Sequence, residues 1–170
     1  MRRATRTRPT IITMNVERFM NRILICVDGS EPALKALDFA AKLADETKAE
    51  LVILTVTEEL YAGNGALQEY AKAEHLTIVW EDLSEGCARE TLSIAHSRAA
   101  VRGGLRIREE WRTGNSTAEI LRFAREQECD VLVVGHVGRS RLAGVLLGSV
   151  AFKLVTLAPC PVTVVGASGQ

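Results

Sequence analysis

Five short strand-like runs, separated by helix-length stretches, constrain the fold of this 170-residue chain more than any other feature. Four of them are almost continuously apolar, which is typical of strands buried on both faces of a parallel sheet. The third mixes charged and apolar residues and is only half apolar, which predicts a strand at or near a sheet edge. The five runs are Ile23 to Val27, Leu51 to Val56, Leu105 to Trp111, Asp130 to Val134 and Pro161 to Val165.

Helix signals lie between these runs. Ser30 is a capping residue followed by Pro32, which fits a first helical turn. Ser84 offers a cap for a second helix, which ends near Gly103. Two further helices are predicted, one from the capping-box spacing Ser116-x-x-Glu119 and one beginning at Ser149.

The alternation of strands and helices predicts an α/β fold: an open five-stranded parallel sheet with helices on both faces. A crossover between parallel strands is right-handed, and a common order for five such strands is 3-2-1-4-5. Under that order the direction of winding reverses between the first and fourth strands. We expect one domain over residues 20–166, with 167–170 as a tail.

Two stretches do not fit the alternation. Residues 1–19 are Arg-rich and precede any periodic pattern, so we expect a disordered basic extension, or an over-extended start with Met14 or Met20 as initiator. Residues 58–82 leave three alternatives open, which are a short helix, a lid and an insertion.

Charge and apolar content exclude several classes of protein. Lys plus Arg and Asp plus Glu both number 21, so the formal net charge is zero, and nothing favours nucleic acid or an anionic membrane as a partner. The apolar runs are far shorter than the ~20 residues that span a bilayer. We expect a cytoplasmic protein.

The four cysteines do not have the spacing of a zinc site, and the chain contains only three histidines. We therefore expect no metal centre. The cysteines are interpreted as small buried apolar residues in a reducing compartment, and they are Cys26, Cys87, Cys129 and Cys160.

Two loop signals are predicted to meet where the strand order reverses. Asp28 leaves the first strand and Gly135 leaves the fourth, and open α/β sheets bind ligands at this reversal. Gly135 carries no side chain that would obstruct a ligand, and Gly138 can present backbone N–H groups. Gly148 and Ser149 then open a helix, whose N-terminus suits phosphate.

The loop after the fourth strand matches neither of the two commonest phosphate motifs. A P-loop needs a Lys before Ser149, and the dinucleotide fingerprint needs its glycines directly after the first strand. A tight strand-to-helix connection without a ligand is the structural alternative. Arg139 and Arg141 lie in the loop, where their charge would assist phosphate binding.

The spacing Gly135-x2-Gly138-x9-Gly148-Ser149 resembles the G-2x-G-9x-G-(S/T) nucleotide motif of the universal stress protein family. The first-strand segment 23–30, the fourth-strand segment 130–135 and the closing segments 146–150 and 158–162 are similar to that family as well. The resemblance covers about residues 21–166 and is weak only over 58–82.

The resemblance implies a Rossmann-like homodimer that binds ATP, with or without Mg²⁺. It implies that Asp28 lies by the adenosine end and that Val56 packs on adenine. Val134 and Gly135 would line the base and ribose. The expected phosphate ligands are Gly138, Gly148, Ser149 and Val150, and Arg139 completes the expected site.

His136 and Val137 depart from the family, which often has small polar or basic residues at these positions. A neutral His136 side chain could donate to phosphate, and the alternative is a solvated side chain.

Three functions remain open: an ATP-binding regulatory module of the stress response, a slow ATP hydrolase or nucleotide-transfer enzyme, and a nucleotide-free dimeric scaffold. No Asp or Glu lies between Gly135 and Val155 to activate water or hold a metal ion, so we expect slow or no turnover. The apolar last strand, Pro161 to Val165, is expected to form the homodimer contact, because an exposed apolar sheet edge invites pairing.

Overall fold

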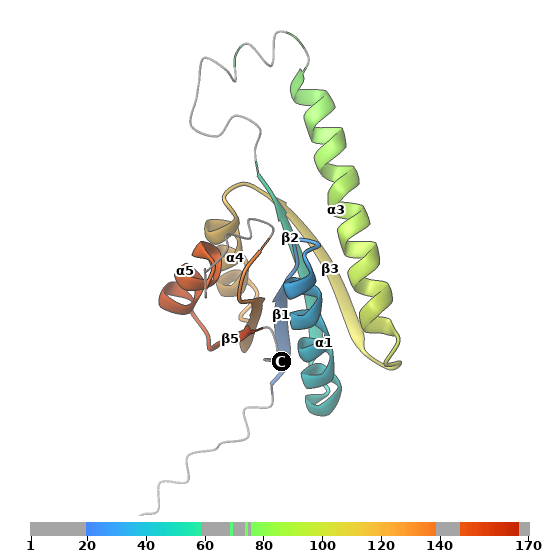
Figure 1. Cartoon of the computed structure of the whole chain (residues 1–170). Coiled ribbons are helices and arrows are strands. Elements are labelled where there is room, and N and C mark those ends of the chain that lie inside the picture. The colour runs from blue at the N-terminus through green and yellow to red at the C-terminus, as the bar shows by residue number, and fades with distance from the viewer. Residues whose placement is uncertain (1–19, 59–68, 70–73, 75, 139–146, 167–170) are drawn as a thin grey trace, which may run out of the picture.

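The computed structural model describes residues 20–58, 69, 74, 76–138 and 147–166, and it confirms the predicted sheet (Figure 1). All strand pairs are parallel and the order is β3-β2-β1-β4-β5. The terminal segments 1–19 and 167–170, and most of the stretch 59–75, lie outside the described residues. The strands are β1 (Arg22–Cys26), β2 (Glu50–Thr57), β3 (Arg106–Thr113), β4 (Val131–Gly135) and β5 (Val162–Val165).

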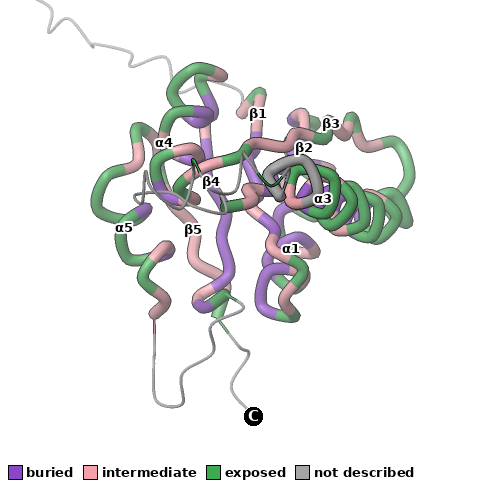
Figure 2. Tube along the Cα trace, turned by 90° about the horizontal axis from the view of Figure 1, so that it is seen from above, coloured by how far each residue is buried: buried purple, intermediate pink, exposed green. Residues whose placement is uncertain are grey.

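Within the described residues, two pairs of helices cover the two faces of the sheet (Figure 2). The helices α1 (Glu31–Thr47) and α3 (Leu76–Ala100) pack on one face, and α4 (Ser116–Glu126) and α5 (Ser149–Leu157) pack on the other. Successive residues of a strand point to opposite faces. Ile23 and Ile25 of β1 therefore join the α1/α3 core, while Leu24 joins the α4/α5 core.

The first helix begins as its sequence predicts. Ser30 is the N-cap of α1, and its hydroxyl accepts a hydrogen bond from the backbone N–H of Ala33 at 3.4 Å. Pro32 lies in the first turn, where its missing N–H removes no helical hydrogen bond. The short turn at Asp28 to Ser30 thus brings the N-terminus of α1 directly beside the end of β1.

The prediction of a cap at Ser84 was wrong. Helix α3 already runs from Leu76, so Ser84 lies two turns inside it, and its residue is only 7% exposed. Ser84 is one of the positions that α3 turns inward, together with Ala88 and Leu92 at helical spacing. The stretch before Ser84 is therefore part of the same helix from Leu76 onward.

The predicted capping box was also wrong, by one residue. Asn115 is the N-cap of α4, and its side-chain oxygen accepts from the N–H of Ala118 at 3.1 Å. Ser116 is the first helical residue instead. Asn is at least as good an N-cap as Ser, so the residue in front of the serine formed the cap. The shift places the Ser116 side chain at the mouth of the pocket described below.

No helix in the described part of the chain is long and apolar enough to cross a membrane. The mixed pattern of β3 is explained by its position, because β3 pairs with β2 alone and forms one edge of the sheet. At the opposite edge lies β5, which pairs with β4.

Candidate functional site

A pocket of about 560 Å³ opens at the carboxyl ends of the strands. This volume lies in the range of small-molecule sites. The pocket brings together eight of the nine residues that sequence reasoning assigned to a site, and the ninth, Arg139, lies outside the described residues. The eight are Asp28, Val56, Val134, Gly135, Gly138, Gly148, Ser149 and Val150.

Asp28 lies at the centre of this pocket, between the ends of β1 and β4. One carboxylate oxygen accepts a hydrogen bond from the backbone N–H of Ser30 at 3.0 Å, which fixes the turn into α1. The other oxygen lies against Gly138, where a Cβ would come within 2.8 Å of it. The residue at position 138 must therefore be small for the Asp28 carboxylate to keep this place.

The start of α5 and the loop after β4 meet in a cradle, which we define as Gly138, Gly148, Ser149 and Val150. The N–H of Gly148 donates to the carbonyl of His136 at 2.7 Å, so the two segments are held together. A Cβ on Gly148 would lie 3.3 Å from the Cα of Val137. Gly148 is the N-cap of α5 and provides no side-chain cap, so first-turn N–H groups of α5 lie beside the pocket.

Gly135 has a different role from the one expected. Its bare backbone was predicted to leave room for a ligand, but it is the first turn of α1 that fills this space. A Cβ at position 135 would lie 2.9 Å from both the carbonyl carbon and the oxygen of Pro32. Gly135 therefore allows α1 to pack against the end of β4, in addition to lining the pocket.

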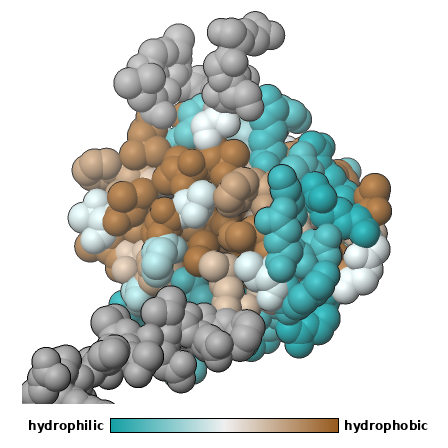
Figure 3. Space-filling view, turned by 90° about the horizontal axis from the view of Figure 1, so that it is seen from below, coloured by the Kyte–Doolittle hydropathy of each residue, from teal (hydrophilic) through white to brown (hydrophobic). Residues whose placement is uncertain are grey.

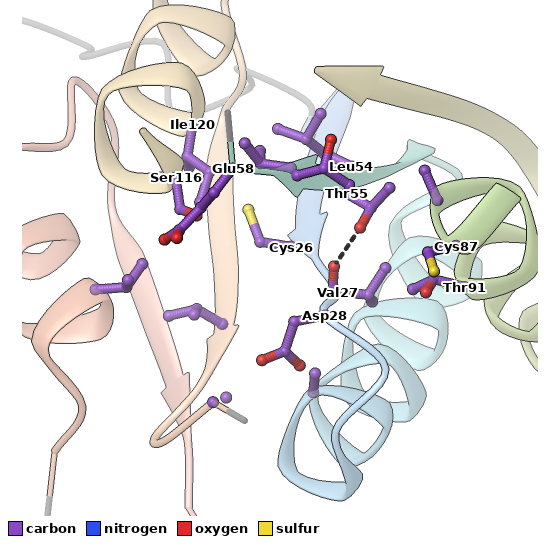
Figure 4. Close-up of a pocket in the computed structure, with 18 of the residues that line it drawn as sticks. Cys26, Val27, Asp28, Leu54, Thr55, Glu58, Cys87, Thr91, Ser116 and Ile120 are labelled. Carbon is purple, nitrogen blue, oxygen red and sulfur yellow. Dashed lines mark hydrogen bonds between the residues drawn. The ribbon is translucent and has the colours of Figure 1, made fainter. Parts of the chain in front are cut away.

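The pocket extends over both faces of the sheet (Figure 4). On the α4/α5 face its wall is apolar, and we call this part the α4 compartment. It consists of Cys26, Leu54, Val56, Ile120 and Val134.

On the α1/α3 face lies a second part, which we call the α3 compartment. Figure 4 shows Cys87 and Thr91 at this side of the pocket, opposite Ile120. No residue of α3 was assigned to a site from the sequence. The α3 compartment consists of Val27, Thr55, Ser84, Cys87, Ala88 and Thr91.

Glu58 is a second pocket carboxylate that the sequence reasoning missed. It follows directly on β2, two residues after Val56, and lines the pocket at its outer end. Trp80 of α3 also lines the pocket, and its indole N–H donates to the Glu58 carbonyl at 3.4 Å. The signal that could have found Glu58 was its place at a strand end next to a predicted ligand residue.

His136 is directed to β5 in this structure. Its Nδ1 lies 3.3 Å from the carbonyl oxygen of Val165, and its backbone N–H donates to the same oxygen at 3.0 Å. This contact involves Nδ1 alone, so the two alternatives for His136, a phosphate donor and a solvated side chain, stay predictions for Nε2.

The cysteines differ from the uniform burial that the sequence suggested. Cys129 is buried, Cys26 and Cys160 are half-buried, and Cys87 is exposed. Burial raises the pKa of Cys129 to about 12 and also raises the pKa values of Cys26 and Cys160. These three thiols are therefore neutral at physiological pH. Within the described ranges no cluster of three or more His, Cys, Asp or Glu residues could hold a metal ion.

Comparison with known proteins identifies the family. The model of the universal stress protein family matches residues 20–166. This chain belongs to the universal stress protein family. Among curated relatives, universal stress protein YxiE of Bacillus subtilis is 34% identical over 148 residues, which cover 85% of this chain and 98% of YxiE.

Solved structures of universal stress proteins share the fold. The UspA protein of Lactobacillus plantarum matches with a TM-score of 0.75 at 24% identity, covering 86% of this chain and 97% of UspA. A universal stress protein crystallised in complex with cAMP matches with a TM-score of 0.66 at 28% identity. That match covers 87% of this chain and 98% of the cAMP-bound protein.

Proposed function

We propose that the pocket binds an adenine nucleotide, with ATP as the ligand, and that the protein is an ATP-binding regulatory module of the stress response. One observation carries this proposal: the start of α5 at Gly148 and Ser149 opens into the same pocket as an apolar wall and the Asp28 carboxylate. A helix N-terminus suits phosphate, apolar side chains suit a base, and a carboxylate accepts hydrogen bonds from ribose hydroxyls. The cAMP complex of a relative supports the same ligand class.

The proposal gives each residue the role that the family resemblance implies. Val56 and Val134 lie in the α4 compartment and cover the base, while Asp28 accepts from the ribose. Gly135 lines the ribose and base beside the first turn of α1. The cradle residues Gly138, Gly148, Ser149 and Val150 hold the phosphates. Arg139, which lies outside the described residues, is expected from the sequence alone to assist them with its charge.

Hydrolysis of ATP is slow or absent under this proposal. Of the described residues that line the pocket, Asp28 and Glu58 are the acids. Asp28 is assigned to the adenosine end, and Glu58 follows β2, on the far side of β1 from the cradle strand β4. Glu58 is therefore remote from the cradle. One Asp28 oxygen lies against Gly138, but under this proposal the Asp28 carboxylate is engaged by ribose hydroxyls and does not activate water at the phosphates. ATP binds with or without Mg²⁺, and Asp28 would reach a metal ion only if the phosphates folded back toward it.

Mass spectrometry of the nucleotide released from denatured, natively purified protein tests the ligand directly. We expect an adenine nucleotide in the sample and a matching heat of binding by calorimetry. No binding at millimolar ATP would reject the proposal and favour the nucleotide-free scaffold. Metal-dependent hydrolysis well above blank, lost in Asp28→Ala, would favour the enzyme instead.

We further propose that a homodimer forms through β5, in the cytoplasm and with neither membrane nor nucleic acid as a partner. Figure 3 shows an apolar area on the side of α5 and a hydrophilic surface on the side of α1 and α3. Phe152, Val155 and Leu157 of α5 are 62%, 53% and 56% exposed. Sedimentation at micromolar concentration should report a dimer that Phe152→Glu weakens, and a monomeric native protein would contradict the proposal.

A further inference from the structure

The α3 compartment is part of the pocket, yet the proposed nucleotide roles leave it unused. It lies on the opposite face of the sheet from α5 and is bounded by three α3 turns, at Ser84, Ala88 and Thr91. Val27 and Thr55 form its floor, where the Thr55 hydroxyl donates to the Val27 carbonyl at 2.9 Å.

The chemistry of this compartment favours a neutral occupant. Its described lining residues carry no charged side chain, and its walls alternate methyl groups with hydroxyl and thiol groups. Ser84 is only 7% exposed and lines the pocket, so its side chain borders the space that an occupant would fill. An occupant with a hydrogen-bond acceptor or donor would match the hydroxyl groups of Ser84 and Thr91 that line this compartment.

The strand order places this compartment at one end of the bound nucleotide. The cradle follows β4, Asp28 follows β1, and Val56 lies on β2, which is the next strand across the sheet. Thr55 adjoins Val56 in sequence but faces α3 rather than α4. A nucleotide with its phosphates in the cradle therefore has its base over β2, next to the opening of the α3 compartment.

We propose that the α3 compartment is a second subsite, which takes a neutral, ring-sized group beside the adenine base. This inference rests on the proposed nucleotide binding in the other part of the pocket. The group arrives either as a substituent on the base or as a separate small molecule, and both sources present the same chemistry to Ser84 and Thr91.

Cys87 provides a readout of occupancy because it lines this compartment and is the exposed cysteine of the four. We would follow its alkylation by iodoacetamide, with Cys87→Ser to identify the reacting thiol. The probes are ATP, N6-benzyl-ATP, and benzamide with and without saturating ATP. N6-benzyl-ATP represents the substituent and benzamide the separate molecule.

We expect ATP alone to change the alkylation rate less than twofold, and one of the two ring-bearing probes to slow it at least fivefold. Protection by N6-benzyl-ATP would identify the group as a substituent on the base, and protection by benzamide would identify it as a separate molecule. Protection by neither overturns the subsite, as does equal protection by ATP, because the nucleotide itself would then fill the compartment.

A variant whose larger side chain fills the α3 compartment tests the proposal, with a matched control on the same helix. Ser84→Leu should abolish the protection while leaving ATP affinity within twofold, and Ser97→Leu, the same change on an exposed position of α3, should alter neither. If Ser84→Leu lowers the melting temperature, Thr91→Leu replaces it. Calorimetry with ATP alone separates the two proposals, because loss of ATP binding rejects the nucleotide while benzamide still tests the compartment.

Discussion

The end of β4 meets a helix on each face of the sheet, and the two junctions are built differently. On one face, Gly135 lies under the first turn of α1, with the Pro32 backbone where a Cβ would be. On the other face, Gly148 opens α5 beside the pocket, and its nearest neighbours belong to the loop at His136 to Gly138. The first junction is closed by packing, whereas the second borders open space.

This difference divides the glycine motif into two physical roles. The glycine at position 135 is required by the contact between a helix and a strand, and that requirement would hold without any ligand. The glycine at position 148 has a φ of −67°, which any residue adopts, so its small size matters for the cradle rather than for the backbone. A motif defined by spacing alone therefore combines a packing constraint with a binding constraint.

The largest expected effect is on stability, from Gly135→Ala. The new Cβ would displace the first turn of α1 from β4, at a cost of about 1–3 kcal/mol as for other overpacked sites. Thermal denaturation without nucleotide should show a melting temperature lower by about 2–4 °C per kcal/mol. Gly86→Ala is the control for an added Cβ without a clash, because a Cβ there meets nothing within 4 Å, and it should raise the melting temperature slightly since Ala favours the interior of α3. An unchanged melting temperature for Gly135→Ala would remove the distinction between the junctions.

The next effect is on binding, from Gly148→Ala. The Cβ would lie 3.3 Å from the Cα of Val137 and 3.4 Å from the His136 carbonyl oxygen, inside the cradle. We expect ATP affinity to fall ten- to hundredfold, about 1.4–2.8 kcal/mol, with stability changed by less than about 1 kcal/mol. Calorimetry and denaturation on the same preparation check both. Normal affinity with lost stability would reverse the roles assigned to the two glycines.

The third prediction concerns the loss of stability at alkaline pH, which tests the core on the α4/α5 face because Cys129 belongs to it. Burial raises the pKa of Cys129 to about 12, against about 8.5 for an unfolded thiol. Because the folded pKa is the higher one, its contribution is complete below about pH 8.5 and is lost as the pH rises toward 12. Urea unfolding at pH 8 and pH 10 gives the free energy of unfolding at each pH. Between these values it should fall by about 1–2 kcal/mol less for Cys129→Ala than for the native chain. If the free energy of unfolding of Cys129→Ala fell as steeply between pH 8 and pH 10 as that of the native chain, the assignment would be refuted.

The smallest effect concerns the ion pair between α1 and α3. Arg98 donates to the two carboxylate oxygens of Asp38 at 2.7 and 2.6 Å, and this hydrogen bonding lowers the pKa of Asp38. Since the folded pKa is depressed, the stabilisation exists above about pH 4 and disappears as the pH falls through the folded value. Both side chains are partly exposed, so Arg98→Ala should cost less than about 1 kcal/mol at pH 7. At pH 2 the urea midpoints of variant and native chain should coincide, and a gap that persists there would point to lost packing instead.

The strands and most helices followed from the sequence because apolar runs and helical stripes report burial directly. The order β3-β2-β1-β4-β5 was predicted as the common one for five parallel strands, and the position of the pocket followed from that order. The start of α4 at Ser116 also followed from the sequence, but the start of α3 at Leu76 and the N-cap at Asn115 did not. Several residues near each start could cap the helix, and only the packed helix selects one. The packing of Gly135 under Pro32 was also beyond the sequence, since the two positions lie 103 residues apart and meet only when β4 and α1 are neighbours.

The α3 wall was missed for a related reason. The α3 residues of the pocket form no recognisable motif. They share only the face of α3 that is directed toward the end of β2, and they are Ser84, Cys87 and Thr91. Glu58 likewise becomes a pocket residue only because β2 ends beside β1.

The parallel course of all five strands has a practical consequence for attachment points. Every strand starts at the edge where Asp130 binds the backbone N–H groups of Asn21 and Arg22, and every strand ends at the edge that carries the pocket. A label on Asn21, at the starting edge, would thus be about 16 Å from the pocket, the length of a five-residue strand. A label on Gly166 would follow Val165, whose carbonyl accepts from the backbone N–H of His136. Immobilisation at Asn21 therefore leaves the pocket free, whereas a fluorophore at Gly166 would report on the loop after β4.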